Sequence, residues 1–196
     1  QQVVRVDWEE RRRLSSGIFK NLLAFVEKTA ADVDVILISD YNKGVVSREI
    51  TGAVIDVANS LEKVSVSNAK PKSAGYLRNA GVVTLNQSEA SAASNVEIDS
   101  VDDVEKAGKK LMQSIGCRGL VITRGAHGLA VFDQSGSIDH IPAIESEVYD
   151  VAGAGDTVVG ALSMGVAAGL DLLNAAAIAN CAGGAVVRKV GVATTS

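Results

Sequence analysis

The segment Gly153-Ala154-Gly155-Asp156 places three small residues and a carboxylate directly before a long apolar stretch. Residues with little or no side chain let backbone N–H groups approach an anion, and the first turn of a helix adds unpaired donors and the positive end of its dipole. This combination suits a phosphoryl group, and Asp156 would then accept the proton of an attacking hydroxyl. The alternative is a helix start shaped for close packing, in which the dipole alone favours Asp156.

A second polar pair, Asn86 and Glu89, follows an apolar run that ends at Leu85. An Asn three residues before a Glu at a helix start is typical of a capping box, and this structural explanation is the stronger one for the pair taken alone. The functional alternative is that Glu89 orders water around a magnesium ion on nucleotide phosphates, since Mg²⁺ often keeps its waters.

Three further polar sites remain, two in loops after apolar runs and one, Asn180, in the last expected helix. Thr123-Arg124-Gly125-Ala126-His127-Gly128 is either a tight turn between two strands or a loop that contacts a nucleotide. Asp40 and Lys43 stand in a loop that either faces solvent or contacts a substrate. Asn180 is either a buried polar group with a backbone partner or a contact beside a nucleotide base.

The sequence lacks the motifs that several other classes of enzyme need. The sequence contains no Walker A loop, Gly-x-Ser-x-Gly, His-Glu-x-x-His or Cys-x-x-Cys motif. With only His127 and His140 available, a hydrolase triad or a zinc site is not expected. Open α/β sheets bind ligands in the loops at strand ends, which is where the candidate residues stand.

Composition excludes several classes of partner. The chain carries 19 Lys and Arg against 23 Asp and Glu, a net charge of −4, which argues against nucleic-acid binding. Asp171 divides the most apolar region, 157–187, so neither part reaches the roughly 18–20 residues of a membrane span. Cys117 and Cys181 are predicted to be reduced core residues, and no signal peptide is visible at the N-terminus, so we expect a cytoplasmic protein.

The elements that must position these residues follow from hydrophobic period and turn residues. Helical and strand-like segments alternate along most of the chain, which predicts an α/β sheet with helices on its faces. The run Val35–Ile38 is typical of a buried parallel strand. No linker interrupts the pattern, so residues 1–196 are predicted to form one domain. We expect helices at 8–31, 47–59, from 86, 101–115, 154–169 and 172–189, and strands at 35–38, 64–67, 82–85, 120–123, 129–132 and 138–141.

The order of these motifs resembles the ribokinase-like (PfkB) carbohydrate kinase family over roughly residues 33–196. The resemblance implies a three-layer sandwich with a mainly parallel central sheet, and an enzyme that uses ATP and Mg²⁺. It also allows a monovalent cation near Asp150 and the C-terminal residues. By similarity, the catalytic base is Asp156, the anion hole is Gly153, Ala154 and Gly155, the phosphate and magnesium motif is Asn86 and Glu89, and the nucleotide positions are Thr123, Gly125, Gly128 and Asn180.

Within the family, the likeness is strongest to the D-glycero-β-D-manno-heptose-7-phosphate kinase domain of ADP-heptose synthase. It is carried by the segments 1–8, 39–44, 148–151 and 191–196. The implied reaction is phosphorylation of O1 of the heptose 7-phosphate in lipopolysaccharide core biosynthesis, with Asp40 and Lys43 as candidate substrate contacts. The alternatives are another sugar or nucleoside kinase, such as a fructokinase, and a non-catalytic nucleotide-binding fragment.

The chain departs from the family pattern at three places. Ala152 replaces the usual Thr before Gly-Ala-Gly-Asp, a mild change because the loop works mainly through its backbone. Asn68-Ala69-Lys70 stands where such kinases commonly carry Asp-Pro-Lys, which removes one carboxylate. The family's first strands, its sugar-contacting residues and most of the lid through which such kinases often dimerise would precede Gln1, so we expect the C-terminal portion of a kinase domain.

Overall fold

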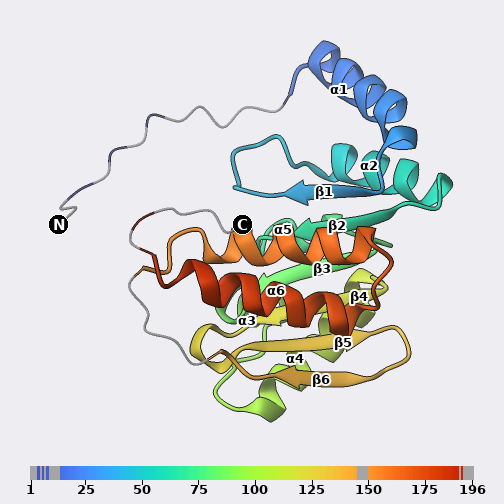
Figure 1. Cartoon of the computed structure of the whole chain (residues 1–196). Coiled ribbons are helices and arrows are strands. Elements are labelled where there is room, and N and C mark those ends of the chain that lie inside the picture. Colours follow the sequence, from blue (N-terminus) through green and yellow to red (C-terminus); the bar gives the residue numbers. More distant parts are fainter. Residues whose placement is uncertain are drawn as a thin grey trace.

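The computed structural model describes residues 4, 6, 8, 14–144, 150–189 and 191 (Figure 1). Within these residues the chain forms six α-helices and six β-strands. The helices are α1 (Ser16–Thr29), α2 (Arg48–Ser60), α3 (Gln87–Ser94), α4 (Val101–Ile115), α5 (Ala154–Ala167) and α6 (Leu172–Val186). The strands are β1 (Val35–Ser39), β2 (Val64–Asn68), β3 (Val82–Asn86), β4 (Gly119–Thr123), β5 (Leu129–Asp133) and β6 (Ile138–Ile141).

The six strands form a sheet whose spatial order is the same as their order in the chain. β1 to β4 run parallel, and the β4–β5 and β5–β6 pairs are antiparallel. Asn68 lies opposite Thr84, and Asn86 lies opposite Thr123, so β2, β3 and β4 end at the same edge of the sheet. The loops that follow these strands are therefore neighbours.

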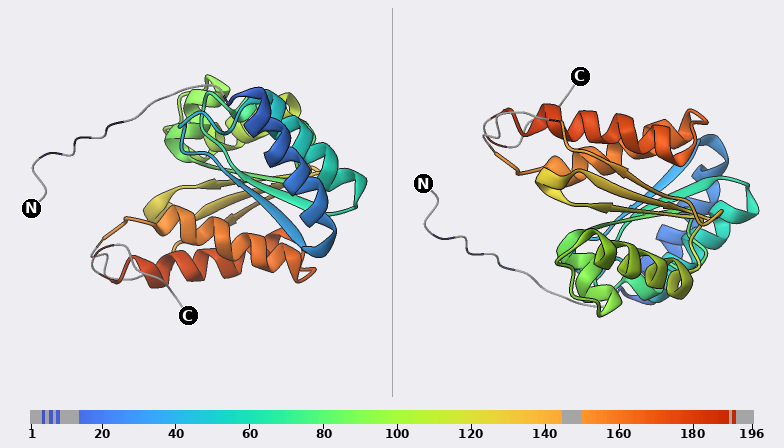
Figure 2. Two further views of the ribbon diagram at one scale, coloured as in Figure 1. Left: turned by 90° about the horizontal axis from the view of Figure 1, so that it is seen from above. Right: turned by 90° about the horizontal axis from the view of Figure 1, so that it is seen from below.

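Helices cover both faces of the sheet, which gives three layers (Figure 2). α5 and α6 lie on one face, where α5 contacts β1 and β2 and α6 contacts β5 and β6. α2, α3 and α4 lie on the other face. Successive side chains of a strand point to opposite faces, so Leu120 and Ile122 belong to the core under α4, whereas Val121 belongs to the core under α5.

The pair α5 and α6 explains much of the Ala and Gly content. Gly165 lies so close to Ala175 that a Cβ on Gly165 would stand 2.9 Å from the Ala175 Cβ. A Cβ on Gly183 would stand 2.7 Å from Cγ2 of Val158. Only residues without a side chain permit this approach of the two helix backbones.

Three sequence predictions need correction. The first helix begins at Ser16 rather than residue 8, because the Ser15 hydroxyl accepts the Ile18 N–H and caps it. Trp8 lies outside the helix and is 95% exposed. β1 is a half-buried strand at the edge of the described sheet, with Leu37 44% exposed, rather than a buried one. Cys181 is exposed on α6, and only Cys117 is a core residue.

The remaining helices and strands follow the sequence prediction to within a few residues at each end. Across the described part of the chain, no helix is long and apolar enough to cross a membrane.

Candidate active site

A hollow of about 230 Å³ opens where β2, β3 and β4 end. Asn68, Asn86 and Thr123 are the last residues of these strands, and all three line it. The start of α5 closes the opposite side with Gly153, Gly155 and Asp156. The fold thus brings together, from segments far apart in the sequence, residues that the sequence analysis selected separately.

The N-terminus of α5 differs from those of the other described α-helices. Side chains of Ser15, Ser47, Asn86, Ser100 and Asp171 cap the other five, whereas α5 begins at Gly153, which has no side chain to offer. Gly153 adopts a left-handed conformation (φ 79°), which glycine favours. The first N–H groups of a helix lack partners within it. In the described structure the Ala154 N–H donates to the Val151 carbonyl at 3.3 Å, and the N–H groups of Gly155 and Asp156 remain available to an anion.

Two further features keep this helix start open to a ligand. A Cβ added at Gly155 would meet nothing within 4 Å, so the space beside its backbone is empty. Asp156 follows in the first turn and is exposed to solvent in the hollow. An anion at the α5 amides would thus lie beside a carboxylate that is free to accept a proton.

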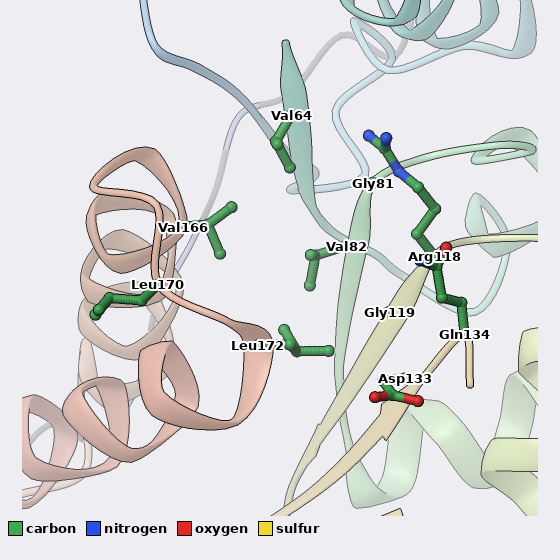
Figure 3. A pocket seen from close by; sticks show the side chains of 10 residues that line it. All are labelled: Val64, Gly81, Val82, Arg118, Gly119, Asp133, Gln134, Val166, Leu170 and Leu172. Carbon is green, nitrogen blue, oxygen red and sulfur yellow. The ribbon is translucent and has the colours of Figure 1, made fainter. Parts of the chain in front are cut away.

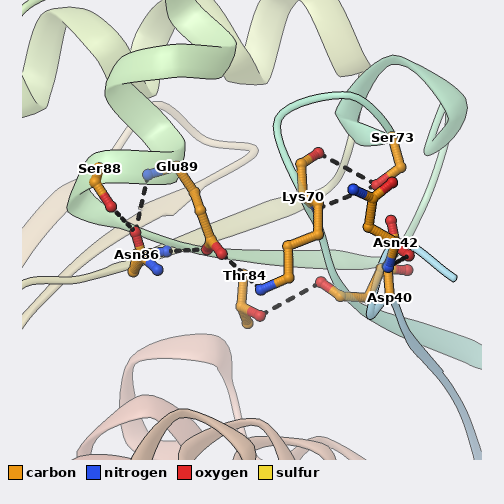
Figure 4. Close-up of polar contacts among 9 residues, drawn as sticks. Asp40, Asn42, Lys70, Ser73, Thr84, Asn86, Ser88 and Glu89 are labelled. Carbon is orange, nitrogen blue, oxygen red and sulfur yellow. Dashed lines mark hydrogen bonds and ion pairs between the residues drawn. The ribbon is translucent and has the colours of Figure 1, made fainter. Parts of the chain in front are cut away.

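Asn86 and Glu89 form the expected capping box at the start of α3 (Figure 4). The Asn86 side-chain oxygen accepts the Glu89 N–H at 2.8 Å, and Glu89 Oε2 accepts the Asn86 N–H at 2.9 Å. Both residues also line the hollow. The structural and the functional interpretation of this pair are therefore compatible.

Lys70 was not among the predicted site residues, yet it lies at the site. Its Nζ lies 2.6 Å from Glu89 Oε1, and the lysine lines the same hollow (Figure 4). Lys70 comes from the loop after β2 and Glu89 from the helix after β3, nineteen positions apart. Two signals in the sequence pointed to this lysine: it ends the segment Asn68-Ala69-Lys70, at the position of the family's Asp-Pro-Lys, and both loops follow neighbouring parallel strands.

A second, larger hollow of about 460 Å³ adjoins the first, and Thr123 and Gly155 line both. Most of its lining is apolar, as is usual for pockets that bind small molecules. Among the predicted nucleotide positions, it includes Thr123, Gly125, Gly128 and Asn180, and it also includes Ala154 of the predicted anion hole.

Two residues of this larger hollow also have structural roles. Asn180 Nδ2 donates to the Pro142 carbonyl at 2.8 Å, which ties α6 to the loop after β6. Gly128 has φ 77°, and a Cβ there would stand 2.0 Å from the Ile141 carbonyl oxygen, so only glycine fits. Asn180 thus has the expected backbone partner, although it is half-buried rather than buried, and its contact beside a nucleotide base stays a prediction.

Comparison with known proteins agrees with this geometry. Residues 12–196 match the pfkB family carbohydrate kinases. The chain belongs to the pfkB carbohydrate kinase family. It is 39% identical to the bifunctional protein HldE of Geotalea uraniireducens and 38% identical to that of Geobacter metallireducens. Each match covers the whole chain and 40% of the relative, so the chain spans less than half the length of these curated proteins.

Solved pfkB-type and ribokinase structures share the fold. Phosphofructokinase-2 from Escherichia coli, in complex with potassium, superposes with a TM-score of 0.80 at 23% identity, over 92% of this chain and 59% of that one. Ribokinase from Arabidopsis thaliana, complexed with ribose and ATP, gives 0.72 at 16% identity, over 94% and 56%. The predicted ribokinase-like α/β fold is confirmed.

The two predicted substrate residues of this pfkB-family chain line neither hollow. Asp40 is 5% exposed, and its Oδ1 accepts the Asn42 N–H at 2.6 Å, which shapes the loop after β1. Lys43 is exposed further along this loop. Their neighbour Tyr41 does line the smaller hollow, so the loop reaches the site through a residue that was not selected.

Asp150, near the predicted monovalent-cation site, joins the start of α5 to the end of α6. Its carboxylate accepts the Ala152 N–H at 2.9 Å and the Gly191 N–H at 3.1 Å. Residues 145–149, 190 and 192–196 lie outside the described residues. They include most of the C-terminal part of that prediction, and with residues 1–3, 5 and 7 they include half or more of three segments that carry the heptose-kinase likeness, 1–8, 148–151 and 191–196.

A third hollow, of about 260 Å³, lies at the opposite end of the strands (Figure 3). Val64, Val82 and Gly119 line it where β2, β3 and β4 begin, together with Leu172 at the start of α6. Arg118 and Asp133 stand at its side. It contains none of the predicted site residues, so we assign the candidate active site to the two adjoining hollows.

Proposed function

We propose that this protein transfers the γ-phosphoryl group of ATP to a sugar hydroxyl. One observation carries the proposal: Asp156 and the start of α5, which has no side-chain cap, line the same hollow as Glu89, and this hollow shares Thr123 and Gly155 with a larger, mostly apolar one. The phosphates of ATP would lie at the start of α5, and its adenine ring would lie in the larger hollow between Thr123 and Asn180.

In the proposed reaction, the acceptor oxygen attacks the γ-phosphorus as its proton moves to the Asp156 carboxylate. The new O–P bond forms while the bond from the γ-phosphorus to the bridging oxygen breaks, and ADP leaves with that electron pair. The N–H groups at the start of α5 stabilise the charge on the phosphoryl group in transit. Asp156 later releases its proton to solvent, which its exposure permits.

Glu89 is the residue that would contact a magnesium ion on the phosphates. Its carboxylate is a hard oxygen donor of the kind that Mg²⁺ prefers, and the ion often keeps waters between itself and the protein. Among the described residues, no group of three or more His, Cys, Asp and Glu side chains could enclose a metal. We therefore assign Glu89 a contact through water, and the ion would supply charge neutralisation at the phosphates.

For the acceptor, we propose O1 of D-glycero-β-D-manno-heptose 7-phosphate. The support is the 36–39% identity to bifunctional HldE proteins, which extends over the whole chain and exceeds that to phosphofructokinase-2. The loop that contains Asp40, Tyr41 and Lys43 borders the smaller hollow and is the proposed acceptor side.

The test replaces Asp156 with Asn and follows ADP release from Mg-ATP with heptose 7-phosphate. We expect turnover to fall about 10²–10⁴-fold, the range for losing a general base, while ATP still binds. Asp56→Asn, an exposed carboxylate on α2 that lines neither hollow, serves as control and should leave turnover unchanged. Undiminished turnover in Asp156→Asn would disprove the assigned role.

A panel of acceptors tests the substrate separately. Heptose 7-phosphate should give the highest kcat/KM among heptose 7-phosphate, fructose 6-phosphate, fructose and ribose. A higher value for any other sugar would overturn the heptose assignment and leave the kinase proposal standing. ATP binding without transfer to any of them would favour a non-catalytic nucleotide-binding protein.

A further inference from the structure

The charges around the two hollows are unfavourable for the ligand proposed to bind there. Asp156 and Glu89 are negative, and a nucleoside triphosphate is strongly negative too. Among the described lining residues of both hollows, Lys70 is the one basic side chain. Asn68, which stands where related kinases commonly carry Asp, adds no charge. Lys70 is thus the only side chain of this lining that could attract a phosphate by charge.

The contacts of the ion pair decide which partner can move. Glu89 is held from two sides: Oε2 accepts the Asn86 N–H at 2.9 Å, and its backbone N–H is bound to Asn86 Oδ1. Its side chain is only 13% exposed. The Lys70 side chain is 33% exposed, and its ammonium group has one hydrogen bond in the described structure, to Glu89.

The backbone of Lys70 is fixed, so only its side chain is free to swing. Its N–H donates to Ser73 Oγ at 3.1 Å, and its carbonyl accepts the N–H groups of Ser73 and Ala74, both at 2.9 Å. A lysine side chain has four flexible carbons and a compact charge. Partly exposed ion pairs are weak, so a triphosphate can draw this ammonium away from Glu89.

We propose that Lys70 binds a phosphate oxygen of the nucleotide, and that Glu89 holds its ammonium group in place until the nucleotide arrives. This inference rests on the proposed function, because it places the phosphates in the smaller hollow. When Lys70 turns to the phosphate, Glu89 Oε1 becomes free to accept a hydrogen bond from a water molecule that is bound to the magnesium ion. Lys70 and the hydrated ion therefore use the same carboxylate oxygen in turn, the lysine before the nucleotide binds and the ion afterwards.

Isothermal titration with ATP, first in EDTA and then in excess Mg²⁺, tests the proposed role of Lys70 in the 196-residue protein. Lys70→Met should weaken ATP binding in EDTA about tenfold or more, because a charge-assisted hydrogen bond is lost. Lys70→Arg keeps the charge and should bind much more tightly than Lys70→Met. Lys72→Met, an exposed lysine of the same loop, is the matched control and should bind as the wild type does.

For each protein, the ratio of the ATP dissociation constant in EDTA to that in Mg²⁺ separates phosphate binding by Lys70 from a merely structural role of this lysine. In Lys70→Met the phosphates lack the charge of the lysine, so the charge of Mg²⁺ should strengthen ATP binding by a larger factor than in the wild type. An equal factor in both proteins, or equal ATP affinity in EDTA, would overturn the inference alone. Circular dichroism checks folding, and Lys70→Gln replaces the methionine variant if that one is unfolded. A wild type that binds no ATP would overturn the proposed function and this inference together.

Discussion

At the scale of single residues, Asn86 and Glu89 show how a structural and a chemical role can share the same atoms. The capping box needs the Asn86 Oδ1 and one carboxylate oxygen of Glu89, and it leaves Glu89 Oε1 for Lys70 or a hydrated ion. The cap thereby orients the carboxylate toward the smaller hollow. Stability and ligand binding should respond differently when this cap is altered.

Asn86→Ala is expected to lower the free energy of unfolding by about 1 kcal/mol, the usual cost of losing an N-cap, and also to weaken Mg-ATP binding. Urea unfolding and calorimetric titration measure the two effects. Ser100→Ala is the matched control, because Ser100 forms a capping box with Asp103 on α4 and lines neither hollow. It should cost about as much stability and leave binding unchanged. If both variants bound Mg-ATP equally well, Asn86 would have only the structural role of a helix cap.

The site residues differ in how far the sequence could predict them. Asp156, Asn86 and Thr123 belong to short local motifs, and the structure brings them to one hollow. Lys70 and Tyr41 also lie in segments that the sequence comparison with the family named, yet neither was selected as a site residue, and their place in the hollow follows from the alignment of neighbouring strands. Asp40 was selected for its charge, yet its carboxylate serves the turn of its own loop. Composition of a loop does not indicate which of its side chains points inward.

At the scale of elements, α5 and α6 must lie close together because the site spans both. α5 provides the amides and Asp156, and α6 provides Asn180 and Gly183 to the larger hollow. The distance between these helices is set by small residues, among them Gly165 against Ala175. Their spacing therefore controls the width of the larger hollow.

Gly165→Ala should destabilise the protein even though alanine is the better helix former. Its Cβ would stand 2.9 Å from the Ala175 Cβ and 3.1 Å from the Ala175 Cα, so the helices must separate. Overpacking of this kind costs about 1–3 kcal/mol, and the helix-forming gain returns up to about 1. We expect a net loss of about 1 kcal/mol in urea unfolding.

Gly160→Ala is the control for this substitution. Gly160 lies on the same helix, and a Cβ there meets nothing within 4 Å. It should raise stability by about 0.5–1 kcal/mol. A gain in both variants would mean that Gly165 does not set the distance between α5 and α6.

Most elements could be predicted because their sequence patterns are local, and the exceptions have identifiable causes. The apolar period of α1 extends back to Trp8 in the sequence, whereas the Ser15 cap starts the helix at Ser16. The apolar run of β1 is typical of a buried strand, yet Leu37 is half-exposed because no described strand lies beyond β1. Cys181 sits among small apolar residues but on the outer side of α6. Burial depends on neighbours that a local pattern does not contain.

At the scale of the whole molecule, one sheet divides the interior into two cores, and the ligand hollows lie at one end of it. The core under α4 contains Cys117, which follows that helix and whose Sγ lies 3.5 Å from Met112 Sδ. Because this thiol is buried in the core, its ionisation is coupled to folding.

Burial raises the pKa of the Cys117 thiol from 9.0 to about 11. Above pH 9 the unfolded chain loses this proton, while the folded protein retains it until about pH 11. The unfolded state then binds fewer protons than the folded state, so stability falls as pH rises through this window and is fully present below pH 9. Urea unfolding at pH 8, 9, 10 and 11 should therefore show a steeper decline in the wild type than in Cys117→Ala, which has no thiol at this position. Equal slopes in the wild type and Cys117→Ala would show that the thiol ionises as readily in the folded as in the unfolded protein, and that the core under α4 admits water.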